Sequence, residues 1–153
     1  MNALELKVPP PVVALVLALG MWVISRFTPT VDVGLLPRVV AGMVLAAIGG
    51  AFSAAGITAF RHAKTTLNPM KPEAASALVT GGVYRYTRNP MYVGLFFVTL
   101  GWAAALGAPW GLLGPVGFIA YIARFQIVPE ERVLMSTFGQ AYTSYLAQTR
   151  RWL

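Results

Sequence analysis

The sequence lacks cysteine entirely and contains a single histidine, His62. Without cysteine there is no disulfide, no thiolate nucleophile and no cysteine-ligated metal. One histidine argues against a histidine-built metal centre, so we expect no metal site. Charge is also scarce, because only 11% of the residues are charged, whereas a soluble domain carries about 25%. This scarcity excludes an ordinary soluble domain and predicts an integral membrane protein.

Hydrophobic residues make up 57% of the 153 residues, and the mean hydropathy is +0.65. They gather in four apolar runs, and a membrane-spanning helix needs roughly 20 such residues. We therefore predict an all-α integral membrane fold of one domain, with four transmembrane helices and a cytoplasmic connecting loop. The first run is expected to be retained as a span, not removed as a signal peptide. The spans cover residues 11–27, 39–60, 90–106 and 110–128, and the cytoplasmic tail 129–153 carries a C-terminal amphipathic helix.

Turn residues indicate where these helices begin, end and pack. The uncharged turn Gly107–Pro109 makes the third and fourth spans antiparallel neighbours. Proline favours the first helical position, so Pro90 starts the third span and Pro129 starts the tail helix, which Gly139 interrupts. A short helix is predicted over residues 72–78. The second run carries small residues that predict a helix-packing face, among them Gly42, Gly49, Gly50 and Ser53.

The net charge of +7 is unevenly distributed along the chain. The loop around Asp32 is nearly neutral, whereas the 61–90 loop and the tail are basic. Because basic loops stay in the cytoplasm, we predict that both termini and the 61–90 loop are cytoplasmic. The spans hold almost no ionisable residue beyond Arg124, which argues against ion transport. The basic residues of these two segments are Arg61, Lys64, Lys71, Arg85, Arg88, Arg132, Arg150 and Arg151.

The stretch from Gly81 to Gly94 reads GGVYRYTRNPMYVG and lies where the polar loop meets the third apolar run. Arg85 and Arg88 are therefore close to hydrocarbon, where a charge is costly unless it is paired. A binding role is one interpretation of these arginines. The alternative is that they anchor the loop by reaching lipid phosphates, with the tyrosines forming an interfacial aromatic belt.

An acidic pair, Glu130 and Glu131, follows the fourth apolar run. Acids in a first helical turn match the helix dipole, which is the simplest interpretation of this pair. The predicted topology also places both acids at the depth of Arg85 and Arg88, on the same side of the membrane. The two segments together therefore predict a two-sided binding site at the cytoplasmic surface.

Both segments resemble the signatures of one enzyme family. The first resembles the pattern G-x-Y-x-x-x-R-[HN]-P-x-Y-x-G of small membrane-embedded methyltransferases that use S-adenosylmethionine. These are the isoprenylcysteine carboxyl methyltransferase and phospholipid methyltransferase relatives, whose second motif is an acidic pair with an aromatic-rich tail. The run from Thr65 to Pro69 is similar to bacterial members, which implies a prokaryotic inner membrane. The matching residues are Gly82, Tyr84, Arg88, Asn89, Pro90, Tyr92 and Gly94, then Glu130, Glu131, Phe138, Gly139, Tyr142 and Tyr145.

The resemblance implies a cofactor pocket for S-adenosylmethionine, built from both motifs and open to the cytosol. Arg88 and Glu131 are the residues expected to act in catalysis, with Arg85 an alternative to Arg88 for holding a carboxylate. Isoprenylcysteine enzymes typically have histidine at the position of Asn89; an amide can still bind a ligand but cannot titrate. The cofactor-binding residues implied are Tyr84, Arg88, Asn89, Pro90, Tyr92, Gly94, Glu130 and Glu131.

The expected function is methyl transfer from S-adenosylmethionine to a hydrophobic or lipid-like substrate that enters from the bilayer. A carboxylate such as a prenylcysteine-type acid is favoured, because an anionic nucleophile needs no general base and the motif holds no histidine. The alternatives are a phospholipid, another small amine or a thiol as substrate, or a non-catalytic membrane scaffold with the same fold. The expected partners are the lipid bilayer and the substrate, with no nucleic acid.

Overall fold

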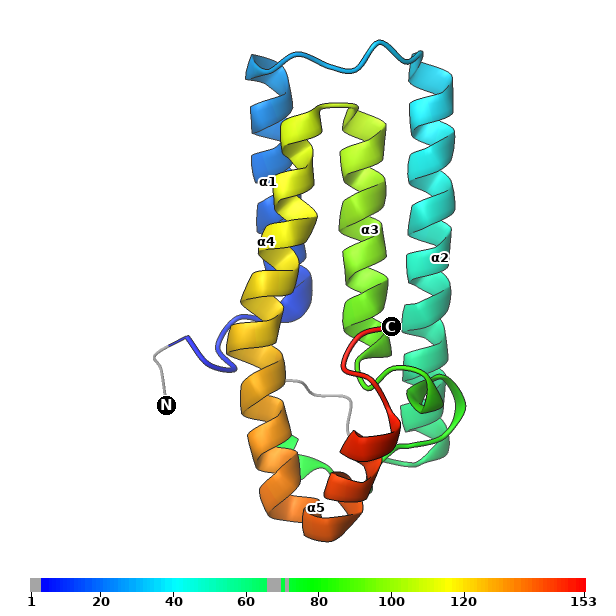
Figure 1. The fold of residues 1–153 in the computed structure, drawn as a ribbon, viewed down its shortest axis with the longest axis vertical. Helices are drawn as coiled ribbons and strands as arrows, with labels where there is room; N and C mark the ends of the chain where they lie inside the picture. Colours follow the sequence, from blue (N-terminus) through cyan, green and yellow to red (C-terminus); the bar gives the residue numbers. More distant parts are fainter. Residues whose placement is uncertain (1–3, 66–69, 71) are drawn as a thin grey trace.

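The computed structural model describes residues 4–65, 70 and 72–153, and this part of the chain forms helices and no strand. Long helical stretches lie side by side along one axis (Figure 1), so the predicted all-α fold is confirmed. Residues 66–69 and Lys71, which entered the sequence analysis, lie outside the described residues. The α-helices are α1 (Pro10–Phe27), α2 (Leu35–His62), α3 (Pro90–Leu106), α4 (Leu113–Ile122) and α5 (Val128–Gln148). Shorter turns are η1 (Pro72–Ala74), η2 (Gly82–Arg85), η3 (Pro109–Leu112) and the π-helical turn η4 (Ala123–Ile127).

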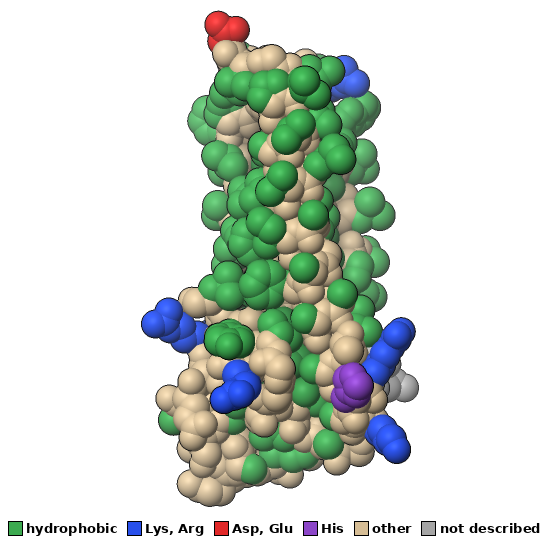
Figure 2. Space-filling model, turned by 90° about the vertical axis from the view of Figure 1, so that its right-hand side faces the viewer, with side chains coloured by type: hydrophobic (Ala, Val, Ile, Leu, Met, Phe, Trp, Pro, Cys, Tyr) green, Lys and Arg blue, Asp and Glu red, His purple; other side chains and the backbone are tan. Residues whose placement is uncertain are grey.

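Three helical stretches in the described chain are long and apolar enough to cross a membrane: Pro10–Phe27, Leu35–His62 and Pro109–Gln148. The helix α3 is also apolar but has 17 residues. Figure 2 shows hydrophobic side chains over the upper part of the molecule and most of the visible Lys and Arg side chains at the lower end. The molecule is therefore a multi-pass membrane protein with one basic end.

The helices α2 and α3 pack closely through glycine. A Cβ atom on Gly42 would lie 2.7 Å from the carbonyl oxygen of Gly101, and one on Gly49 would meet the carbonyl oxygen of Gly94. Small residues let helix backbones approach in lipid, so the predicted packing face on the second span is confirmed. Gly50 is an exception, because a Cβ there would meet open space.

The turn between α3 and α4 is as tight as predicted. Gly107 has a φ of +64°, which glycine adopts without strain, and its N–H closes the last turn of α3 on the carbonyls of Ala103 and Ala104. Proline at position 109 then starts η3. The helices α3 and α4 consequently run antiparallel beside each other (Figure 1).

The tail differs from the prediction, because no break separates it from the fourth apolar run. One helix continues through η4 from Pro109 to Gln148, a length of 40 residues. From Pro109 to the kink at Gly139 the helix rises about 45 Å at roughly 1.5 Å per residue, more than the roughly 30 Å of hydrocarbon, so its lower end extends beyond the membrane. Proline 129 is tolerated because the carbonyl of Phe125, which loses its helical donor, accepts the N–H of Leu6 at 3.0 Å. The predicted interruption at Gly139 is confirmed by its φ of 49° and ψ of −120°.

The predicted short helix over residues 72–78 is reduced to the turn η1 (Pro72–Ala74). The hydroxyl oxygen of Thr65 accepts the backbone N–H of Ser76 at 2.9 Å and that of Ala77 at 3.4 Å. These N–H groups are then not available for helical bonds, since each backbone N–H is a single donor. The segment instead crosses the lower end of the bundle as an irregular wall.

Candidate functional site

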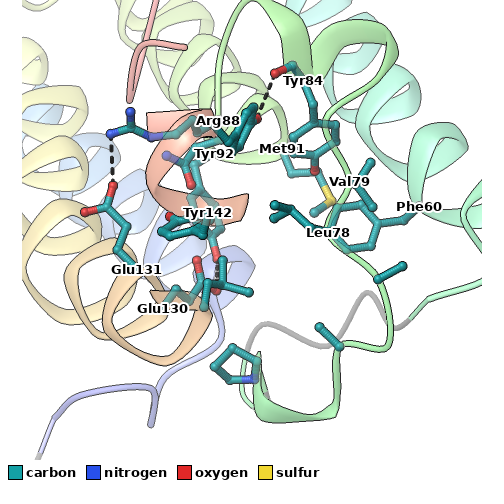
Figure 3. Close-up of a pocket in the computed structure, with 16 residues that line it drawn as sticks. Phe60, Leu78, Val79, Tyr84, Arg88, Met91, Tyr92, Glu130, Glu131 and Tyr142 are labelled. Atoms are coloured by element: carbon teal, nitrogen blue, oxygen red, sulfur yellow. Dashed lines mark hydrogen bonds and ion pairs between the residues drawn. The ribbon is translucent and has the colours of Figure 1, made fainter. Parts of the chain in front are cut away.

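A pocket lies at the basic end of the bundle, where the end of α2, the irregular 72–79 segment, the start of α3 and the helix α5 meet. Figure 3 shows that its α5 side carries Glu130, Glu131 and Tyr142, while Phe60, Leu78 and Val79 form an apolar wall opposite. The cavity measures about 110 Å³. Pockets for drug-sized ligands start at roughly 300 Å³, so this cavity is smaller than such pockets.

Glu131 holds two arginines at one edge of this pocket. Its Oε1 atom lies 3.1 Å from Nη2 of Arg88 and 3.0 Å from Nε of Arg151, and its Oε2 atom lies 2.6 Å from Nη2 of Arg151. The bidentate bond to the carboxylate raises the pKa of Arg151 above its ordinary value. The negative charge of Glu131 is therefore neutralised within the protein.

Arg88 donates several hydrogen bonds to other residues of the protein. Its Nη1 atom donates to the carbonyl oxygens of Leu146 and Thr149, and Nη2 donates to Glu131. The Nε atom is buried and has no hydrogen-bond partner among the residues that the structure describes. The Arg88 guanidinium thus joins the start of α3 to the end of α5, and three of its hydrogen bonds go to other residues of the protein.

Glu130, one residue earlier, has neutral partners. Its Oε1 atom accepts the phenolic hydroxyl of Tyr92 at 2.6 Å and the side-chain amide of Gln126 at 2.9 Å. Among the described residues, no Lys, Arg or His side chain lies within ion-pair distance of Glu130. This partly buried carboxylate lines the pocket without a neutralising charge, which suits a cationic group on a ligand.

Aromatic side chains surround this carboxylate. Tyr84, Tyr142 and Tyr145 are buried and line the pocket. The hydroxyl of Tyr145 donates to the backbone carbonyl of Tyr84 at 2.7 Å, and the ring of Tyr84 meets Phe60 edge to face with centroids 5.4 Å apart. Burial, and secondarily the nearby Tyr145 and Glu130, raise the pKa of Tyr84, so its phenol stays neutral. Aromatic faces beside a carboxylate favour a cation or a planar ring.

The structure brings most of the predicted site residues together and separates a few. Pro90 and Gly94 do not line the pocket: a Cβ on Gly56 of α2 would lie 3.2 Å from Pro90, and one on Gly94 would meet Ser53. Both residues therefore serve the packing of α3 on α2. Arg85 is exposed and also does not line the pocket. The predicted residues that share the pocket are Tyr84, Arg88, Asn89, Tyr92, Glu130 and Glu131.

Asn89 anchors the C-terminal segment. Its Nδ2 atom donates to the carbonyl oxygen of Arg151 at 2.9 Å, and the backbone N–H of Arg88 donates to the carbonyl oxygen of Arg150 at 2.9 Å. Thr87 forms an isolated parallel bridge with Arg150. An amide at position 89 therefore has a defined partner, and the contact that it makes does not depend on titration.

Several residues in or beside the pocket were not predicted as site residues from the sequence. Arg151 was interpreted only as a topological charge, and Gln126 was not singled out. Tyr142 and Tyr145 entered as part of the second motif without a role. The signal that connects them is Gly139, because the reversal there returns the end of α5 to the pocket. A glycine inside an amphipathic helix is a visible signal for such a reversal.

The family model described as phospholipid methyltransferase matches residues 37–141, which span α2 to most of α5. An uncharacterised protein of Haemophilus influenzae is 43% identical over 63 residues, which are 41% of this chain and 100% of that protein.

Two protein-S-isoprenylcysteine O-methyltransferases also match over part of their length. The protein of Schizosaccharomyces pombe is 38% identical over 71 residues, which are 44% of this chain and 29% of that enzyme. The protein of Tribolium castaneum is 41% identical over 73 residues, 46% of this chain and 25% of that enzyme. The chain thus matches less than a third of the length of either enzyme. No solved structure matches the chain.

Proposed function

The chain belongs to the phospholipid methyltransferase family, and from this premise we propose that it transfers a methyl group from S-adenosylmethionine to a hydrophobic or lipid-like substrate. The observation that carries the proposal is Glu130, a carboxylate without a neutralising charge among tyrosines at the basic end of a membrane bundle. A cofactor with cationic groups and a planar base fits that environment. When bound, it supplies a methyl group that a nucleophile takes by in-line displacement, with the carbon–sulfur bond electrons leaving on sulfur.

The donor set supports this cofactor in detail. Glu130 is proposed to accept hydrogen bonds from the amino group or to face the sulfonium, and the tyrosines are proposed to hold the adenine. Arg151, whose side chain is 41% exposed, is proposed to hold the cofactor carboxylate beside the pocket. Arg88 and Glu131 are proposed to act in catalysis by fixing the two halves of the site in place, since their polar atoms already contact the protein.

The small cavity implies that cofactor loading moves the irregular wall. The helices around the pocket are packed against one another, whereas in the described chain the 72–79 segment contains the turn η1 and is tied to Thr65 by hydrogen bonds from Ser76 and Ala77. We propose that this segment moves outward to admit the cofactor and then covers it. Such closure would exclude water from the reacting groups.

The membrane arrangement that goes with this chemistry has four spans in one domain. In this proposal, α3 is the third of the four spans along the chain. It crosses despite its 17 residues, because a local thinning of the bilayer accommodates a short helix. Both termini and the pocket then lie on the cytoplasmic side, and a prokaryotic inner membrane is the proposed location. The substrate would reach the pocket from the bilayer between helices.

The substrate is proposed to carry either a carboxylate or an amine. The expected preference for a carboxylate rests on the chemistry of the nucleophile, because a carboxylate anion needs no general base. An amine headgroup is the second candidate, because Glu130 can accept its proton. A carboxylate yields a base-labile methyl ester and an amine yields a base-stable N-methyl group.

Label transfer tests the proposed reaction. Detergent-purified protein would be incubated with lipid extract and S-adenosylmethionine labelled in its methyl group, with Glu130→Gln protein as the control. We expect label in the organic phase with the wild-type protein and at least tenfold less with the variant. Alkaline treatment then separates ester from amine. Cofactor binding without any lipid labelling would support a non-catalytic scaffold instead.

A further inference from the structure

The N-terminal segment lies against the π-helical turn η4, which directly precedes the helix α5 that lines the pocket. The N–H of Leu6 donates to the carbonyl oxygen of Phe125 at 3.0 Å. Glu5 is buried, with a side chain 3% exposed, and its two carboxylate oxygens lie 3.3 Å from Nη1 of Arg124 and 3.3 Å from Nη1 of Arg132. The same buried acid thus pairs with Arg124 inside the turn and with Arg132 beyond it.

This contact completes a helix that would otherwise lose a hydrogen bond. In a regular helix the N–H of residue 129 would donate to the carbonyl of Phe125, but proline has no N–H. Leu6 supplies the missing donor from outside the helix. A π-helical turn contains one residue more than a turn of regular helix. A contact that holds this turn therefore also influences the direction of the side chains that follow it in α5.

The turn aims Gln126 toward the site. Gln126 is 2% exposed, and its amide donates to Oε1 of Glu130 at 2.9 Å, the same atom that accepts the hydroxyl of Tyr92. Two neutral donors thus fix the orientation of the carboxylate that faces the pocket. Gln126 belongs to η4, and η4 is held by the hydrogen bond from Leu6 and by the ion pairs of Glu5.

We propose that Glu5 is a positioning residue for the site, which holds η4 in place so that Gln126 orients Glu130 toward the ligand. The inference rests on the proposed function, because it assigns Glu130 to cofactor binding. A purely structural role for Glu5 makes a different prediction: its loss would lower stability without a specific link to Gln126. The two roles differ in whether the effects of the two residues on ligand affinity are coupled.

The test is a double-mutant cycle on full-length protein in detergent, titrated with S-adenosylhomocysteine. Glu5→Gln, Gln126→Ala and the double variant are compared with Asp32→Asn, an exposed acid in the loop between α1 and α2. We expect Glu5→Gln to weaken binding about tenfold, or 1.4 kcal/mol, and the double variant to bind no more weakly than the weaker-binding single variant. Additive losses, or an unchanged affinity of Glu5→Gln, would overturn the inference.

Hydrogen exchange without ligand separates this outcome from failure of the proposed function. We expect faster amide exchange over residues 123–131 in Glu5→Gln than in Asp32→Asn, with α2 unaffected. If wild-type protein fails to bind S-adenosylhomocysteine, the proposed function falls and the inference falls with it. If wild-type protein binds and residues 123–131 exchange alike in both variants, the inference alone is wrong. Should Glu5→Gln not fold, Arg132→Gln takes its place, since that side chain is 57% exposed.

Discussion

Glu130 and Glu131 are adjacent in the chain and differ in what neutralises them. Glu131 lies between Arg88 and Arg151, so its charge is balanced within the protein. Glu130 has only the neutral donors Tyr92 and Gln126 in the described structure. A desolvated carboxylate costs free energy unless it is paired. We therefore propose that Glu131 holds the site together and that Glu130 faces a ligand.

Glu131→Gln tests the first of these roles. The substitution removes the charge shared by Arg88, which is 13% exposed, and Arg151. Breaking a buried ion pair costs about 3–5 kcal/mol, and partial exposure here should lower that to about 2 kcal/mol of unfolding free energy. Thermal unfolding in detergent measures the loss. Glu73→Gln, an exposed acid of η1, is the control, and equal stability of the two variants would contradict the role.

At the scale of elements, a rigid frame of helices is joined to a pocket wall with few bonds. The α2–α3 interface is closed by glycine pairs with no room for a Cβ. The 72–79 segment instead relies on Thr65, whose hydroxyl oxygen lies 3.2 Å from that of Ser76. Local opening follows such differences in packing and hydrogen bonding, so the wall is the element expected to move.

A disulfide across this wall tests its movement. The chain has no cysteine, so Thr65→Cys with Ser76→Cys gives a single cross-linkable pair at two positions whose hydroxyl oxygens lie 3.2 Å apart. We expect the oxidised protein to bind S-adenosylhomocysteine at least tenfold more weakly than the reduced protein, because the wall cannot open. Either single cysteine variant controls for the substitutions. Equal affinity of the oxidised and reduced forms would show that the wall is not the entry.

For the whole molecule, the proposed topology places the pocket and both termini on one side. A cysteine-free chain allows this to be tested with Asp32→Cys and Leu153→Cys, two exposed positions. The first lies in the loop that joins α1 and α2, and the second is at the C-terminus, beside the start of α3 (Figure 1). In right-side-out cell preparations, we expect an impermeant thiol reagent to label the first variant and to label the second only after permeabilisation. Labelling of both variants in intact cells would contradict a cytoplasmic C-terminus.

Features set by nearby residues were predictable from the sequence. The turn at Gly107, the start of α3 at Pro90 and the irregular geometry at Gly139 each depend on the conformational limits of one residue. The predicted topology also placed the first motif and the acidic pair on the same side of the membrane. Residues of both segments line one pocket at the basic end of the bundle.

Features that depend on distant partners were not predictable. Proline 129 signals a helix start, and only the N–H of Leu6, far away in sequence, lets the helix continue through it. Gly94 belongs to the first motif but contacts α2, because a motif match does not distinguish a ligand contact from a packing contact. Arg151 resembles any terminal basic residue until the fold brings it to Glu131.

The most direct test of the proposed site is calorimetric titration of detergent-purified protein with S-adenosylhomocysteine, for the wild type and Glu130→Gln. We expect the wild type to bind, and the variant to lose about 1.5–3 kcal/mol of binding free energy, the range of a hydrogen bond to a charged group. Asp32→Asn, an exposed acid outside the pocket, should bind like the wild type. Absence of binding by the wild type, or equal affinity of Glu130→Gln, would contradict the assignment of this pocket to the cofactor.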